Sequence, residues 1–105
     1  MKVIVIGATG TIGQAVVKKL SARHEVIKVG HKGGEYHVDI GSAESIKKLY
    51  ETIGTVDAIV STAGLAAFRT LEQLTDDDFL LSVSNKLMGQ VNLIRIGVPY
   101  TRPEA

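Results

Sequence analysis

Three glycines follow one another at intervals of three residues near the N-terminus, in the segment Gly7-Ala8-Thr9-Gly10-Thr11-Ile12-Gly13. Gly7 can turn the chain sharply out of a strand, and Gly10 lets the backbone approach a pyrophosphate where a Cβ would intrude. Gly13 allows a following helix to lie close against a sheet. The unpaired amides around Thr11 and Ile12 would face the anion with the positive end of the helix dipole.

The hydroxyls of Thr9 and Thr11 can add donors to the same anion. The loop joins a β-branched apolar run to an amphipathic segment, and in that setting the glycine pattern is typical of dinucleotide binding. The alternative is a glycine-rich turn that serves packing alone. A P-loop is disfavoured, because no Gly-Lys-Ser/Thr follows the glycines.

Alternating strands and helices would position this loop. Short β-branched runs predict strands over 3–6, 26–29, 36–38 and 58–60. Helical periods predict a helix over 11–22, a second that Ser42 caps and Gly54 ends, and a third that Pro99 stops. The order β-α-β-β-α-β-α implies an α/β domain with right-handed crossovers, strand order 3-2-1-4 and helices on both faces of a parallel sheet.

The third helix begins at Thr75, which can form a capping box with Asp78. Its apolar stripe consists of Leu80, Val83, Leu87, Val91, Ile94 and Val98. Further apolar residues around the helix exceed what one sheet face can cover, and strand 58–60 would be an exposed edge. We therefore expect a homo-oligomer through helix 76–98. The alternative is a monomer whose loop 62–74 folds over the helix.

Composition excludes several classes of protein. The 105 residues, 45% hydrophobic and 22% charged, are those of one globular domain spanning 1–105. A net charge of +1 gives no strong attraction to nucleic acid or anionic membranes. The absence of cysteine excludes disulfides, thiol nucleophiles and cysteine-based metal centres, and the three histidines lack metal-ligand spacing. With no apolar run near ~20 residues and none suited to a signal peptide, we expect a cytoplasmic protein without membrane partners.

The spacing Gly-x-x-Gly-x-x-Gly resembles the short-chain dehydrogenase/reductase family, especially its small bacterial members. Asp39 and Ile40 resemble the family's adenine-side acidic–hydrophobic pair, in which Asp39 would accept a hydrogen bond from the adenine amino group. Asp39 could alternatively cap the next turn. The segment Ser61-Thr62-Ala63-Gly64 is similar to the family's Asn-Asn-Ala-Gly motif, with both amides replaced. Ala63 and Gly64 would keep the backbone near the cofactor ribose, or form only a tight strand exit.

The resemblance spans residues 1–100 and includes 87–93, which is similar to the family's fourth helix, commonly part of a subunit interface. It implies a Rossmann-like fold, truncated relative to the complete domain. The family's helix asparagine normally precedes the helix glycine by three residues, and counting back from Gly89 reaches Lys86. Asn85 is one residue away, about 100° around a regular helix.

The end of the second predicted strand favours NADP(H) over NAD(H). NAD-binding domains commonly place a carboxylate there, which bonds the ribose hydroxyls. Gly30 occupies that place here, and His31 and Lys32 follow it as partners for a 2′-phosphate. The alternative is a solvated loop with no ligand role.

The family's catalytic pair is missing. Its chemistry uses a Tyr-x-x-x-Lys pair to supply a proton to the carbonyl oxygen. The three tyrosines are followed four residues later by Ile40, Gly54 and Glu104, so no catalytic residue can be named. We read the chain as the NADP(H)-binding portion of an oxidoreductase that moves hydride between NADPH and a carbonyl or alcohol. The alternatives are a non-catalytic dinucleotide-sensing or interaction module, and a ligand-free relic that is stable only as an oligomer.

Overall fold

The computed structural model describes residues 1–31, 33–63 and 71–102. Four strands, all parallel, form one sheet in the order β3-β2-β1-β4. They are β1 (Lys2–Ile6), β2 (Glu25–Gly30), β3 (Tyr36–His37) and β4 (Ala58–Ser61). The predicted strand order and the Rossmann-like class are therefore confirmed, with β3 one residue shorter than predicted.

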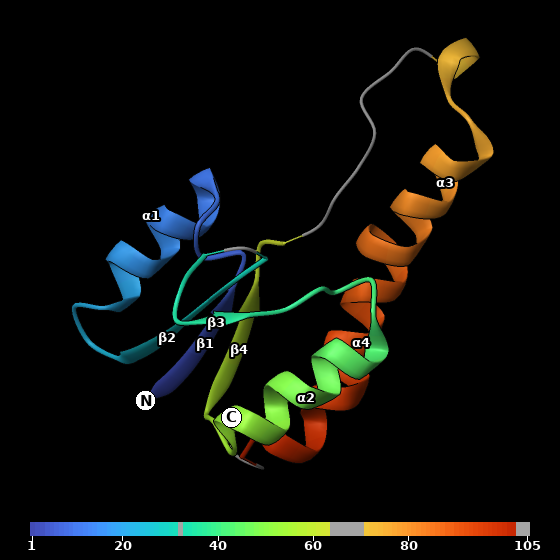
Figure 1. Cartoon of the computed structure of the whole chain (residues 1–105). Coiled ribbons are helices and arrows are strands. Elements are labelled where there is room, and N and C mark those ends of the chain that lie inside the picture. The colour runs from blue at the N-terminus through green and yellow to red at the C-terminus, as the bar shows by residue number, and fades with distance from the viewer. Residues whose placement is uncertain (32, 64–70, 103–105) are drawn as a thin grey trace.

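Helices cover both faces of the sheet. The α-helices are α1 (Thr11–Leu20), α2 (Ala43–Ile53), α3 (Asp76–Ser82) and α4 (Met88–Gly97). Figure 1 shows α1 on one side of the sheet and α2 with α4 on the other. The helix expected over 11–22 ends at Leu20, and the expected loop 62–74 includes a 3₁₀ turn over Leu71–Gln73.

The long third helix is interrupted. A π-helical turn, η2 (Val83–Leu87), joins α3 to α4, and a 3₁₀ turn, η3 (Val98–Tyr100), follows and contains Pro99. The predicted caps are present. Thr75 and Asp78 form a reciprocal capping box, with hydrogen bonds of 3.0 and 3.2 Å. Ser42 caps α2, and Gly54, with φ of +83°, ends it.

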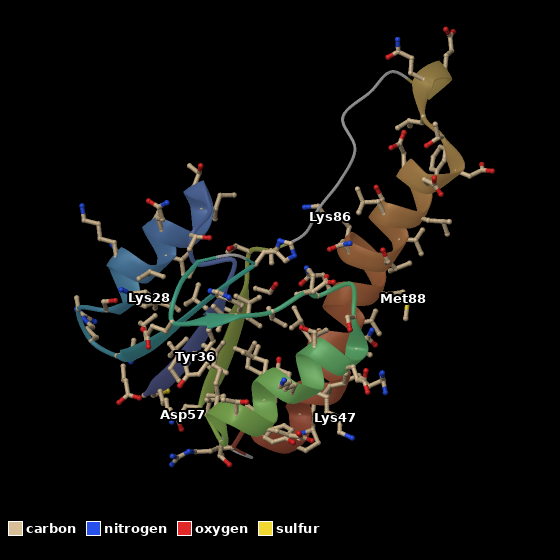
Figure 2. The ribbon with its side chains drawn as sticks, viewed as in Figure 1. Lys28, Tyr36, Lys47, Asp57, Lys86 and Met88 are labelled. Carbon is tan, nitrogen blue, oxygen red and sulfur yellow. The ribbon has the colours of Figure 1, made fainter. Side chains whose placement is uncertain are left out.

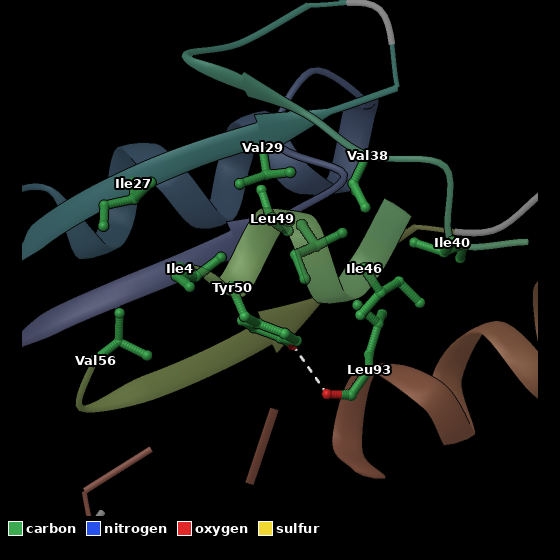
Figure 3. Packing of buried hydrophobic residues seen from close by; sticks show 11 residues of the cluster. Ile4, Ile27, Val29, Val38, Ile40, Ile46, Leu49, Tyr50, Val56 and Leu93 are labelled. Atoms are coloured by element: carbon green, nitrogen blue, oxygen red, sulfur yellow. Dashed lines mark hydrogen bonds between the residues drawn. The ribbon is translucent and has the colours of Figure 1, made fainter. Parts of the chain in front are cut away.

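β1 lies at the centre and is buried on both faces, since Val3 to Ile6 are at most 2% exposed. Ile4 and Ile6 pack toward α2 and α4, as the close-up in Figure 3 shows for Ile4. Val3 and Val5 pack on the other face, against the apolar side of α1. The alternation of side chains along a strand produces these two cores from one continuous apolar run.

α2 and α4 are fixed to one another through Tyr50. Its buried hydroxyl donates a 2.9 Å hydrogen bond to the Leu93 carbonyl, drawn in Figure 3, and its ring stacks on Tyr100 with centroids 5.5 Å apart. A Cβ on Gly97 would lie 2.8 Å from the Tyr50 hydroxyl, so the small residue permits this approach. Desolvation raises the pKa of Tyr50 to about 12.

The predicted apolar stripe of the long helix is exposed rather than packed. Its six residues range from 42% exposed at Val91 to 69% at Ile94. The buried face of α4 consists instead of Gly89, Leu93 and Gly97. The two glycines let α4 come close to Ile40 and Tyr50. Because this small-residue face is turned to the core, the larger apolar side chains point outward.

β4 is the edge strand, as expected. The chain that follows α4 comes back beside the residues that precede β4. Val56 forms a parallel bridge with Thr101 through backbone hydrogen bonds of 2.8 and 3.0 Å. Figure 2 shows Asp57 at this end of β4. Its carboxylate accepts from the Lys2 amide at 2.7 Å and pairs with Arg102 at 3.0 Å. Within the described residues, no helix is long and apolar enough to cross a membrane.

Candidate functional site

A pocket of about 210 Å³ lies beyond the carboxyl ends of the strands. It is lined by Ile6, Gly7, Thr9, Gly10, Gly30, His31, Val38, Asp39, Ile40, Thr62, Ala63 and Asn85. β1 is paired with β2 on one side and β4 on the other, so the connections leave it in opposite directions. Ligands of open α/β sheets bind in the crevice at such a switch point.

Two of the three loop glycines are required by the fold itself. Gly7 has φ of +89°, and a Cβ there would lie 2.7 Å from the Thr62 hydroxyl and 2.8 Å from the Ala63 amide. A Cβ on Gly13 would collide with the Gly7 carbonyl. Gly13 thus lets α1 lie against the end of β1, the packing expected of it, and Gly7 takes a positive φ where the chain leaves β1, beside the segment that follows β4.

Gly10 differs, because the protein leaves space around it. Among the described residues, a Cβ there would meet only the Gly7 carbonyl, at an ordinary 3.4 Å, and Gly10 lines the pocket. It is also the N-cap of α1, where no side chain of the described residues caps the helix and the first turn carries no acidic residue. The helix therefore presents uncapped amides beside open space, and such termini bind anions.

The end of β2 has no room for a side chain. A Cβ on buried Gly30 would lie 3.0 Å from the Thr9 hydroxyl and closer still to the Gly33 carbonyl. A carboxylate at this position is therefore excluded by packing. Exposed His31 lines the pocket next to it, whereas Lys32 lies outside the described residues.

Asp39 also lines the pocket and has a structural role there. Its Oδ1 accepts a 3.0 Å hydrogen bond from the Gly41 amide, and its own amide donates to the Ser45 hydroxyl at 2.9 Å. The turn-capping alternative is thus present in the structure. Within the described residues no donor reaches Oδ2, so one carboxylate oxygen remains available to a ligand.

Thr62 and Ala63 continue from β4 and tie three elements together. The Thr62 hydroxyl donates toward the carbonyls of Ile6 and Gly7 at 3.3 Å each. The Ala63 carbonyl accepts a 2.9 Å hydrogen bond from the side-chain amide of Gln90 on α4. This part of the loop is therefore anchored to both β1 and α4, while Gly64 lies outside the described residues.

The structure brings seven of the twelve predicted site residues into the pocket: Gly7, Thr9, Gly10, His31, Asp39, Ile40 and Ala63. Thr11, Ile12 and Gly13 do not line it, and the Ile12 side chain is exposed. The prediction missed Ile6, Val38 and Thr62, which adjoin residues it named. It also gave no role to Asn85, which is buried and lines the pocket. Asn85 lies in the π-helical turn η2, where the 100° per residue of a regular α-helix does not apply.

Taken together, the glycine loop, the uncapped helix and the switch point define a dinucleotide-binding α/β domain. The chain belongs to the NAD dependent epimerase/dehydratase family, whose model matches residues 3–97. This match supports the resemblance to short-chain dehydrogenases and the NAD(P)-binding class of fold.

Solved structures show the same fold. Protein lin1944 from Listeria innocua is 44% identical with a TM-score of 0.96, and the match covers 100% of this chain and 52% of that one. A small-chain dehydrogenase in complex with NADPH is 26% identical with a TM-score of 0.85, covering 98% of this chain and 47% of that one. The chain thus spans about half the length of these proteins.

One curated relative is a longer, bifunctional protein. It is the ribulose 5-phosphate reductase/CDP-ribitol pyrophosphorylase Bcs1 of Haemophilus influenzae, 27% identical over 103 residues. The match covers 94% of this chain and 21% of the relative.

Proposed function

We propose that this chain is the NADP(H)-binding portion of a short-chain dehydrogenase/reductase. The observation that carries the proposal is Gly10, a pocket-lining glycine at an uncapped helix N-terminus where the fold itself has room for a side chain. A ligand that approaches the backbone closely explains this space, and a pyrophosphate fits the exposed amides of α1.

Different pocket residues would bind different parts of the dinucleotide. The amides at the start of α1, with the Thr9 hydroxyl, hold the pyrophosphate, while the Gly10 amide itself donates to the Gly7 carbonyl at 3.1 Å. Asp39 and Ile40 bind the adenine end, and the backbone at Ala63 lies along the ribose. When bound, the reduced dinucleotide would supply the hydride that reduces a carbonyl substrate.

The preference for NADP(H) follows from the end of β2. Gly30 has no room for the carboxylate that would bond a ribose 2′-hydroxyl and repel a 2′-phosphate. His31 lies beside this position at the pocket, and Lys32 follows it in sequence. A relative of similar fold in complex with NADPH supports the same choice.

The proposal is tested by adding a side chain where the pyrophosphate would lie. Gly10→Val should abolish NADPH binding in isothermal calorimetry while leaving the thermal unfolding transition in place, since the fold has room for the Cβ. Ala15→Val is the matched control, because it adds a similar volume at an exposed position of the same helix. Binding that is equal in Gly10→Val and Ala15→Val would show that the phosphate assignment is wrong.

A non-catalytic dinucleotide-sensing module is the second candidate. It requires no Tyr-x-x-x-Lys pair, and residues 1–105 contain none. Both candidates require NADPH binding. Expressing the whole reading frame that encodes the chain and screening carbonyl substrates separates the two candidates, since only the first predicts turnover.

A further inference from the structure

Apart from Tyr50 with its hydroxyl, Asn85 is the only buried residue with a polar side chain among the described residues, with 6% of its surface exposed. It lies in η2, where the Met88 amide donates to the Val83 carbonyl five residues earlier rather than four. Single π-turns of this kind are uncommon within α-helices and frequently occur at functional sites. Both the burial and the irregular turn indicate that Asn85 has a role beyond helix formation.

Asn85 uses its amino group within the helix and leaves its carbonyl oxygen to the pocket. Nδ2 donates to the Leu81 carbonyl at 3.3 Å and toward the Ser84 hydroxyl at 3.5 Å. Among the described residues, no donor reaches Oδ1. No side-chain N or O atom of these residues is both buried and without a hydrogen-bond partner, so Oδ1 must be accessible to solvent. Oδ1 is therefore open to the pocket that Asn85 lines.

Asn85 and Asp39 meet at the same end of this pocket. The position that a Cβ on Gly41 would occupy is 3.2 Å from Asn85 Nδ2 and 3.2 Å from Asp39 Oδ1. The helix amide and the loop carboxylate therefore flank one glycine, although they come from different elements. Asp39 Oδ2 and Asn85 Oδ1 are two acceptors that the protein itself does not use.

The two segments that carry these acceptors are packed against each other. A Cβ on Gly89, one turn after Asn85, would lie 3.0 Å from the Ile40 side chain and 3.1 Å from its carbonyl. The helix thus rests directly on the Asp39–Ile40 loop, and Gln90 holds it to Ala63. Acceptors held in this way can discriminate between ligands, because they do not move to suit a different one.

We propose that Asn85 is a base-specificity residue, whose Oδ1 accepts one N–H of the 6-amino group of an adenine while Asp39 accepts the other. This rests on the proposed dinucleotide function. A 6-amino group has two donor hydrogens and matches two acceptors, whereas a 6-oxo base would place a third acceptor against them. A site that hydrogen-bonds a particular group rejects analogues that leave its buried partners unpaired.

The test compares NADPH with its hypoxanthine analogue, which carries a 6-oxo group in place of the amine. Calorimetric titrations give the ratio of the two dissociation constants for the unmodified chain and for Asn85→Ala and Asn85→Leu. The ratio should favour NADPH and fall about fivefold in both variants, the effect of one neutral hydrogen bond. Asn92→Ala is the matched control, since that amide accepts from Arg95 at 3.0 Å in an exposed contact and should leave the ratio unchanged.

Thermal unfolding shows which Asn85 variant is folded, and either one suffices, because alanine and leucine are both good helix formers. An unchanged ratio in a folded variant overturns the role of Asn85 and leaves the proposed function standing. Failure of the unmodified chain to bind either dinucleotide overturns the proposed function and this inference together.

Discussion

Gly10 and Gly13 stand three residues apart in one loop, yet a side chain would meet different surroundings at each. At Gly13 it would strike the backbone of Gly7, whereas at Gly10 it would enter the pocket. Sequence reasoning could assign both roles because the glycine spacing encodes them. It considered Asn85 but could not place it in the site, since an asparagine between Ser84 and Lys86 carries no signal of burial.

Burial of Tyr50 should make the free energy of unfolding of the chain depend on pH. Its pKa is raised from 10.0 to about 12 by desolvation in the folded state, so above pH 10 the unfolded chain loses this proton first. Stability from the buried neutral hydroxyl is complete below pH 10 and is lost as the pH rises toward 12. Urea denaturation should show this loss in the unmodified chain.

Tyr50→Phe should weaken that pH dependence and lower stability at pH 8 by about 1 kcal/mol, because the Leu93 carbonyl loses its hydrogen bond. Tyr36→Phe, at a half-buried strand position, is the control and should retain the dependence. Equal slopes above pH 10 in the unmodified chain and Tyr50→Phe would contradict the assignment to Tyr50.

At the scale of elements, the long helix departs most from expectation. Its caps follow from local residue preferences and were predicted, as was the end near Pro99. The π-turn was not predicted, because it depends on how Asn85 and Gly89 fit against the loop at Ile40, a contact between distant segments. The same contact turns the apolar stripe outward.

We propose that this exposed stripe pairs with a second copy across a two-fold axis, since monomers rarely expose large apolar patches. Light scattering at micromolar concentration should give a dimer for the unmodified chain. Leu87→Asp should give a monomer, because it places a charge at the centre of the paired stripes. Ala15→Asp on α1, across the sheet, makes the same charge change and should remain a dimer. A monomeric unmodified chain, or a dimer that persists in Leu87→Asp, would contradict the proposal.

At the scale of the whole molecule, the fold was predicted more completely than the site. Alternating element types and short connections restrict a parallel sheet to few topologies, and the order 3-2-1-4 is among them. The pocket could be predicted only where motifs mark it, at the glycine loop, Asp39 and Ala63. Ile6, Val38 and Asn85 reach it through packing that short motifs do not encode.

The chain spans about half of its solved relatives and lacks the Tyr-x-x-x-Lys pair. We therefore expect the isolated chain to show no NADPH-dependent carbonyl reduction. Loss of general acid catalysis alone lowers rates by about 10²–10⁴-fold, and loss of substrate positioning lowers them further. The measurement is NADPH oxidation, followed by its absorbance, across a panel of aldehydes and ketones. Turnover at ordinary enzyme rates that Gly10→Val abolishes would contradict this expectation.

The central claim is that the pocket at the carboxyl edge of the sheet binds a dinucleotide and prefers NADP(H). Calorimetric titration of the unmodified chain with NADPH and NADH, in parallel, tests it most directly. We predict that both bind at one site and that NADPH binds about tenfold more tightly, the lower end of the range for a charge-assisted contact at an exposed group. Equal affinities, tighter binding of NADH, or no binding of either would contradict it.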